Sequence, residues 1–341
     1  MTAPELLAAA ILAALVLYAL AGGADFGGGI WDLLAAGPRK RDQRALIEHA
    51  LGPIWEANHV WLILAVVLLF TGFPAAFAAV SIALFVPLTL LLFGIVLRGA
   101  AFTFRTYDEP RDRVQARWGF LFSASSAVAP FLLGVVVGAV ASGRLHDATN
   151  GAPDLWAWLS PFPLAVGAFA AALFAFLAAA YLAVEAEGAL RDDFRRRAMG
   201  AGVAVFACAA VAGALSWREA PVVFAGLTAR GFTVPLHLAT GAAAVTAFAA
   251  LWRGAVRLGR AAAAAQVVLI VVGWGASQHP YLVVPDLTIA GAAASPATLV
   301  PVLWAVAAGA VLLFPALFLL FRVFKGERPF AVLDRSRPSG R

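Results

Sequence analysis

The residues best suited to do chemistry lie together in the segment Gly52–Trp61, which reads Gly-Pro-Ile-Trp-Glu-Ala-Asn-His-Val-Trp. Glu56 and His59 are three residues apart, so they share one face of a helix, and Trp55 lies near His59 on that face. Asn58 is adjacent to it. A carboxylate and an imidazole at the start of an apolar run are costly unless they are paired or used. The segment therefore indicates either a proton-handling site or a satisfied polar patch between helices.

Further carboxylates are spaced so that they could face this segment. Asp25 and Asp32 are seven residues apart, so a continuous helix presents both on one side. Glu48 and Glu56 are eight apart and can line one path. Carboxylates along facing helices, reached from one membrane surface, are what a proton-uptake path requires. The glycines around Asp25 lack the strand and the Lys-Ser/Thr pair of a phosphate loop, so they favour close helix packing over ligand contact.

The composition is that of a membrane protein. Of the 341 residues, 62% are hydrophobic and only 13% are charged, more apolar surface than a soluble chain of this length can bury. The apolar runs are too long for barrel strands, and in lipid the backbone must satisfy its own hydrogen bonds, which predicts an all-α protein. We expect nine transmembrane helices, over residues 5–22, 54–72, 76–97, 118–141, 161–184, 198–216, 231–252, 261–278 and 299–324.

Positive charge alternates between the connecting segments, which predicts the orientation. Lysines and arginines gather after the odd-numbered runs and in the C-terminal tail, whereas the even-numbered loops hold only Arg144, Arg218 and Arg230. Basic loops stay in the cytoplasm, so the N-terminus is expected to be periplasmic and the C-terminus cytoplasmic. The net charge of +6 is thereby assigned to the membrane surface and not to nucleic acid. Arg98, after the third run, is expected to extend to the cytoplasmic interface.

The rest of the composition limits the number of domains and the kinds of cofactor that this chain can hold. We expect one transmembrane domain over residues 1–330 and a disordered cytoplasmic tail over 331–341, which is polar and basic. A single cysteine, Cys208, excludes an intramolecular disulfide framework and a cysteine-cluster metal site. Five histidines are present, but no helix pairs two of them as some bis-histidine cytochromes do. We therefore predict neither a metal site nor a haem ligand in this chain.

Several motifs together resemble subunit II of the cytochrome bd-type quinol oxidases, especially the cyanide-insensitive branch. They extend over most of the chain, and the Gly52–Trp61 motif is the most specific of them. The others are Gly23-Ala24-Asp25-Phe26-Gly27, Arg98-Gly99 with Phe102 and Arg105, Glu187-Gly188 before a basic loop, and Trp274-Gly275 with Tyr281–Leu287. Nine spans with an outer N-terminus also agree with this family.

The resemblance implies a haem-free subunit without a complete active site. Its partner, subunit I, would hold low-spin haem b, high-spin haem b and haem d, and a small single-helix subunit is a further candidate partner. The complex would oxidise quinol at the outer face of the bacterial inner membrane and reduce dioxygen with cytoplasmic protons. A bound quinone or lipid in this chain is also compatible with the resemblance.

The resemblance also implies residue roles. Glu56 stands where family members carry an acidic residue of a proton path, although some members have aspartate there. Asp25 matches the acid of the first motif, and Asp32 and Glu48 are assigned to the same path. Two tryptophans are assigned to oxygen access or packing, Trp61 and Trp55. An interface or structural role is expected for Asn58, His59 and Arg98.

Two alternatives stay open at this point. A secondary transporter would suit nine spans with buried carboxylates, although no matched pair of interrupted helices is found in the two halves of the chain. A purely structural subunit, whose acids only pair with basic groups, is the other.

Overall fold

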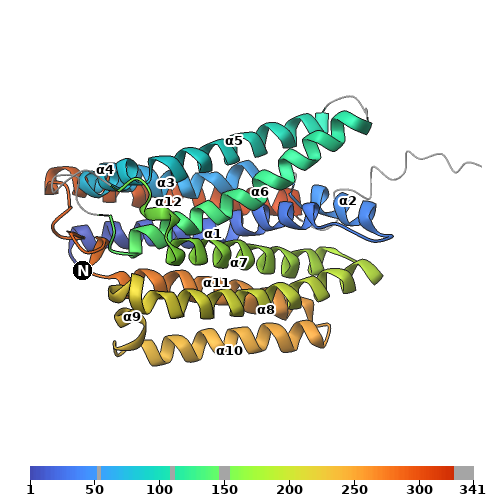
Figure 1. Ribbon diagram of the computed structural model, residues 1–341. Coiled ribbons are helices and arrows are strands. Elements are labelled where there is room, and N and C mark those ends of the chain that lie inside the picture. The colour runs from blue at the N-terminus through green and yellow to red at the C-terminus, as the bar shows by residue number, and fades with distance from the viewer. Residues whose placement is uncertain (52–54, 108–111, 146–153, 326–341) are drawn as a thin grey trace, which may run out of the picture.

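A computed structural model describes residues 1–51, 55–107, 112–145 and 154–325 (Figure 1). The described chain is almost entirely helical. The helices are α1 (Ala3–Leu33), α2 (Lys40–Leu51), α3 (Trp55–Gly72), α4 (Pro74–Ala83), α5 (Phe85–Tyr107), α6 (Asp112–Ala141), α7 (Pro161–Glu185), α8 (Gly188–Glu219), α9 (Pro221–Thr228), α10 (Thr233–Trp252), α11 (Val256–Gln278) and α12 (Pro296–Lys325), with a 3-10 turn η2 (Ala157–Leu159). An antiparallel pair of short strands, β1 (Tyr281–Val283) and β2 (Leu287–Thr288), joins α11 to α12.

The long helices lie side by side in one elongated bundle, as expected of an all-α membrane protein (Figure 1). Within the described ranges, eight helices are long and apolar enough to cross a membrane. The pair α3 and α4 supplies a ninth candidate span if it is counted as one broken span. The predicted all-α class is therefore confirmed, and the described chain reaches the predicted nine spans when the broken pair is counted as one.

The third predicted span, residues 76–97, is wrong in its boundaries. That run is divided between α4 and α5, and the spanning helix is α5, which continues to Tyr107. The chain breaks at Phe73, where Pro74 opens α4, and α4 turns 117° away from α3. Proline begins a helix readily because its missing N–H is not needed in the first turn, so the apolar run restarts in a new direction.

Helix α1 is the central element of the bundle (Figure 1). It packs against α3, α6, α7 and α11, and the indole of Trp31 donates a hydrogen bond to the Ala175 carbonyl of α7 at 2.7 Å. The glycine-rich stretch does not interrupt it. A β-carbon at Gly27 would lie 2.0 Å from the Phe174 carbonyl oxygen, and one at Gly29 would lie 2.2 Å from Ser126 of α6. The glycines therefore admit neighbouring helices, as the packing interpretation predicted.

Helix α12 lies at the edge of the bundle and contacts α1 and α3. None of its most apolar window is buried within this chain. Its outward side chains are large and apolar, among them Trp304, Leu312 and Phe318. This face must therefore meet lipid or another protein.

Replacing Gly27 with alanine should destabilise the bundle, because the added methyl group collides with the α7 backbone. Overpacking of this kind costs about 1–3 kcal/mol, so the thermal midpoint of the purified protein should fall by several degrees. Gly213→Ala is the matched control, since nothing lies within 4 Å of a β-carbon there. Equal midpoints for the two variants would contradict the close approach of α1 and α7.

Candidate functional site

A buried ion pair joins α1 to α5. Nη2 of Arg98 lies 2.5 Å from Oδ1 of Asp25, and only 1% and 2% of the two side chains are exposed. The Arg98 Nε donates to the Ser126 hydroxyl of α6 at 2.9 Å. Removing a charged group from water costs several kcal/mol, which the partner charge and additional hydrogen bonds must offset. Three helices are thus required to bury this one pair.

Arg98 does not extend to the cytoplasmic interface, so that expectation was wrong. Its guanidinium carbon lies 4.9 Å from the centroid of the Phe26 ring and 5.0 Å from that of Phe122. Aromatic faces attract a cation, and the attraction is strongest where water is excluded. With Asp25 and Ser126, these rings offset the desolvation of the guanidinium, so Arg98 does not need to reach water at the membrane surface.

Further polar groups border the Asp25 carboxylate. Asn58 of α3 is buried beside it. Oδ2 of Asp25 and the hydroxyl of Tyr18 have no hydrogen-bond partner among the described residues. Buried polar atoms of this kind are expected to bind a water or a transferable proton. Asp25 therefore lies among several buried polar groups inside an otherwise apolar bundle.

A second pair repeats this arrangement two turns along α1. Asp32 is fully buried, and Nη1 of Arg105 lies 3.1 Å from its Oδ2. The Ser123 hydroxyl of α6 donates to the same oxygen at 2.6 Å. Arg44 of α2 is 3.7 Å from Oδ1, so Asp32 receives charged groups from two helices.

Glu48 extends this second cluster towards water. Its Oε2 lies 3.4 Å from Nη2 of Arg105, and 40% of its side chain is exposed. The sequence predicted Asp32 and Glu48 in one group, and the structure does bring them together through Arg105. A carboxylate that is half in water and half against a buried pair is suited to pass protons between the two environments.

The two pairs form a ladder between parallel helices. The aspartates and the arginines are each seven residues apart, and each aspartate is 73 residues from its arginine in the sequence. Helix α6 lies between α1 and α5, and its serines leave room for the arginines to reach across. Sequence reasoning missed this pairing, although the equal spacing of Asp25/Asp32 and Arg98/Arg105 was the signal that could have revealed it.

The remaining predicted residues lie on α3. The His59 ring packs against Tyr18 and Phe26, with centroids 6.1 and 5.9 Å apart. Trp61 is buried and contacts Phe314 of α12, which supports a packing role. Glu56 and Trp55 fall in the first turn of α3, but their side chains lie outside the described residues.

Two observations bear on metals and haem. No group of three or more His, Cys, Asp or Glu side chains that could hold a metal ion occurs in the described part of the chain. The His59 ring is packed against two aromatic side chains, whereas an axial ligand must direct a ring nitrogen at a porphyrin.

Removing one charge of the buried pair should be far more harmful than removing both. Asp25→Asn and Arg98→Gln each leave an unpaired buried charge, at a cost of about 3–5 kcal/mol. The double variant should recover much of the lost thermal stability. Asp192→Asn is the control, because 59% of its side chain is exposed and ion pairs of exposed carboxylates contribute about 1 kcal/mol or less. Additive losses in the double variant would contradict the pairing.

Comparisons with known proteins place the chain in a family. The family model described as cytochrome bd terminal oxidase subunit II matches residues 3–324. The cytochrome bd-I ubiquinol oxidase subunit 2 of Escherichia coli K12 is 28% identical over 209 residues, which are 58% of this chain and 53% of that protein. The chain thus aligns with about half the length of this curated relative.

Two further proteins match over nearly the whole chain. A putative cytochrome bd menaquinol oxidase subunit II of Bacillus subtilis 168 is 23% identical over 330 residues, covering 92% of this chain and 93% of that protein. A chain in the structure of bd oxidase from Geobacillus thermodenitrificans has a TM-score of 0.79 at 21% identity, covering 96% of this chain and 100% of that one, so it shares the fold. The chain therefore belongs to the cytochrome bd terminal oxidase subunit II family and is a multi-pass protein of the bacterial inner membrane.

Proposed function

We propose that this chain is the haem-free subunit II of a quinol:oxygen oxidoreductase, a terminal oxidase of the respiratory chain. The observation that carries the proposal is the family match over residues 3–324. Membership of this family argues against the alternative that the chain is a secondary transporter. The partner is a haem-bearing subunit I, in which low-spin haem b, high-spin haem b and haem d supply the redox chemistry. The proposal also includes a small single-helix subunit as a further partner, and a quinone or lipid bound by this chain.

The proposed orientation of the chain in the membrane rests on where positive charge lies in the bundle. The N-terminus and the short helices α4 and α9 lie at one end, while α2 lies at the other (Figure 1). The turns α1–α2, α7–α8 and α10–α11, with the helix turns that follow them, carry Arg39, Arg41, Arg44, Arg191, Arg195, Arg196, Arg197, Arg253, Arg257 and Arg260. The positive-inside rule assigns this basic end to the cytoplasm, and the N-terminus to the periplasm.

The proposed proton path begins at the basic end of the bundle. Glu48 is exposed enough to exchange protons with water and contacts the Arg105–Asp32 pair. Seven residues of helix separate Asp32 from Asp25, which is roughly 10 Å along the axis at about 1.5 Å per residue. That is too far for direct transfer, so bound water must bridge the two clusters. The proposed path then leads to Glu56, which lies in the first turn of α3, the helix that also carries Asn58.

A structural role for the acids is the competing proposal, and one observation favours it. Asp25 and Asp32 are both paired with arginines inside the bundle, as expected of groups that only hold helices together. The two proposals differ at Glu56. A structural acid can be replaced by its amide in an assembled complex without loss of turnover, whereas a proton carrier cannot.

The contact with subunit I is proposed to include the outer face of α12. Trp61 packs α3 against α12 through Phe314, so this face continues into the helix that carries Glu56. A buried tryptophan here would either line an oxygen route or fill the space between helices. The contact with Phe314 supports the second possibility for Trp61.

Replacing Glu56 with glutamine should slow oxygen reduction by about 10²-fold or more, the usual effect of removing a positioned proton-transfer group. Haem content and the KM for quinol should change little, because the proposed role of this side chain is proton transfer and not the binding of quinol or haem. Glu56→Asp should retain part of the rate, since it keeps the carboxylate one methylene shorter. Oxygen consumption with excess quinol is the measurement.

The control for this experiment is Glu185→Gln, an exposed acid at the same end of the bundle. Unchanged turnover of the Glu56→Gln complex across the pH range would exclude the proton relay and leave the structural role.

Purification from the native membrane tests the assignment itself. The chain should co-purify with a haem protein whose reduced-minus-oxidised spectrum contains a haem d or a second high-spin haem band. The purified material should consume oxygen when quinol is added. A colourless chain that is active alone, or that binds a transported solute, would contradict the proposal.

A further inference from the structure

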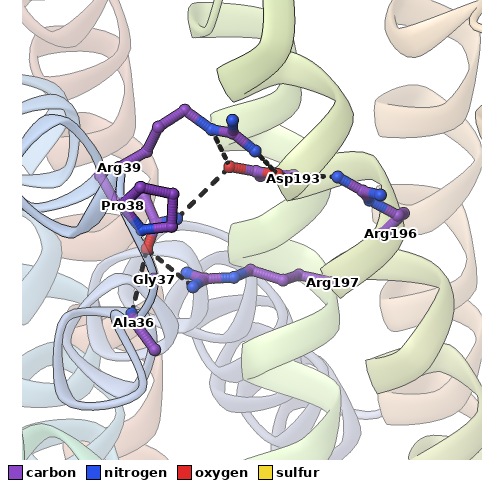
Figure 2. A pocket seen from close by; sticks show the side chains of 8 residues that line it. Ala36, Gly37, Pro38, Arg39, Asp193, Arg196 and Arg197 are labelled. Atoms are coloured by element: carbon purple, nitrogen blue, oxygen red, sulfur yellow. Dashed lines mark hydrogen bonds and ion pairs between the residues drawn. The ribbon is translucent and has the colours of Figure 1, made fainter.

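A polar pocket of about 320 Å³ lies at the basic end of the bundle, between the α1–α2 turn and α8 (Figure 2). It plays no part in the proposed proton path. We call it the arginine pocket, and the residues that line it are Ala36, Gly37, Pro38, Arg39, Gln43, Asp193, Arg196 and Arg197.

The turn that forms one wall of the pocket is fixed by its sequence. Gly37 has a φ of +78°, which favours glycine, and no atom lies within 4 Å of a β-carbon built there. The backbone N–H of Ala36 donates to Oε1 of Gln43 at 3.3 Å, which closes the turn on the first part of α2. Arg39 is thereby held opposite α8.

One carboxylate in the pocket is fully engaged. Asp193 accepts two hydrogen bonds from Arg39, at 2.7 and 2.6 Å, and one from Arg196 at 2.9 Å. Gln43 adds a longer contact of 3.4 Å. The hydrogen bonds to Asp193 also raise the pKa of Arg39, which stays charged. Asp193 therefore has no capacity left to neutralise another cation.

Arg197 forms no ion pair with a carboxylate of the described chain, and Asp193 acts on its charge only from a distance. Its Nη2 donates to two neutral acceptors, the Gln43 Oε1 at 2.8 Å and the Leu34 carbonyl at 3.4 Å. Its guanidinium carbon lies 5.2 Å from the Trp31 ring and 5.4 Å from the Phe194 ring. Its Nη1 is buried with no hydrogen-bond partner among the described residues.

The lining of the pocket thus carries three arginines and one carboxylate, a net charge of +2 from Arg39, Arg196, Arg197 and Asp193. Figure 2 shows the three arginines converging on the pocket from two sides. Guanidinium groups bind phosphate oxygens with paired N–H donors, and basic pockets between helices at a membrane surface suit anionic head groups. We propose that the arginine pocket binds a phosphate group.

Two sources could supply this phosphate. An anionic phospholipid would place its head group in the pocket and its chains along α1 or α8, whereas a free phosphate would enter from water. A purely structural reading, in which the arginines only clasp the turn onto α8, predicts no binding of either.

The test measures binding to the purified protein in the complex that it forms. Delipidated protein is titrated with phosphatidylglycerol or, as the zwitterionic comparison, phosphatidylcholine, and bound lipid is counted by native mass spectrometry. Inorganic phosphate is titrated separately by calorimetry. The pocket variant is Arg196→Gln/Arg197→Gln, and the control is Arg253→Gln/Arg257→Gln, which removes the same charge from exposed positions at the same end of the bundle.

Binding should weaken by about tenfold or more in the pocket variant, which corresponds to roughly 1.4 kcal/mol of binding free energy. Binding should be unchanged in the control variant. Selective loss of phosphatidylglycerol identifies a lipid head group, and selective loss of inorganic phosphate identifies a free anion. Equal binding to the pocket variant and the unaltered protein, or an equal loss in the control, overturns the proposal.

A milder change keeps the test decisive if the double variant fails to assemble. The side chain of Arg196 is 69% exposed, and within the described residues it hydrogen-bonds only to Asp193, so Arg196→Gln should leave the turn intact. Arg196→Gln should still weaken phosphate binding severalfold. Arg197→Lys keeps the positive charge but loses the paired N–H donors of the guanidinium, so it should weaken binding less than a variant that removes the charge of Arg197. Unchanged binding in Arg196→Gln overturns the proposal.

Discussion

The buried Asp25–Arg98 ion pair is the constraint on which the arrangement of the central helices depends. A charge in a hydrocarbon-like interior is tolerated only when a partner and further hydrogen bonds replace water. Here the partner comes from α5, the hydrogen bond from α6 and the aromatic faces from α1 and α6. All three helices must therefore keep their register. The glycines of α1 serve the same end, because they let α6 and α7 approach closely enough to seal the pair.

Much of the fold could be predicted from the sequence, because lipid leaves a chain few choices. Long apolar runs must be helices, and the helices α1, α6, α7, α8, α10, α11 and α12 fall where such runs occur. The division of residues 76–97 between α4 and α5 could not be predicted in the same way. Hydropathy reports whether a residue suits lipid and says nothing of the direction of the backbone, and the apolar character of the run continues across the break at Phe73 and Leu84.

The site was predicted less completely than the fold, and for a different reason. Helical periodicity is local, so it placed Asp25 and Asp32 on one side of α1, where both meet arginines of α5. The partners of these acids are 73 residues away in the sequence, and no local pattern connects them. Judged alone, Arg98 follows an apolar run and resembles an arginine at a membrane surface. Its burial becomes reasonable only once Asp25 and Ser126 are known to be beside it.

The ion-pair ladder and the arginine pocket meet at the end of α1. Arg44 binds the Asp32 carbonyl, and Arg197 binds the Leu34 carbonyl, so the last turn of α1 is held from both sides. Helix ends leave carbonyl groups without partners, and arginines are suited to satisfy them. Gln43, which closes the pocket, lies in the same helix as Glu48 and five residues before it. One helix therefore carries both the residue that closes the pocket and the carboxylate that opens the proposed proton path.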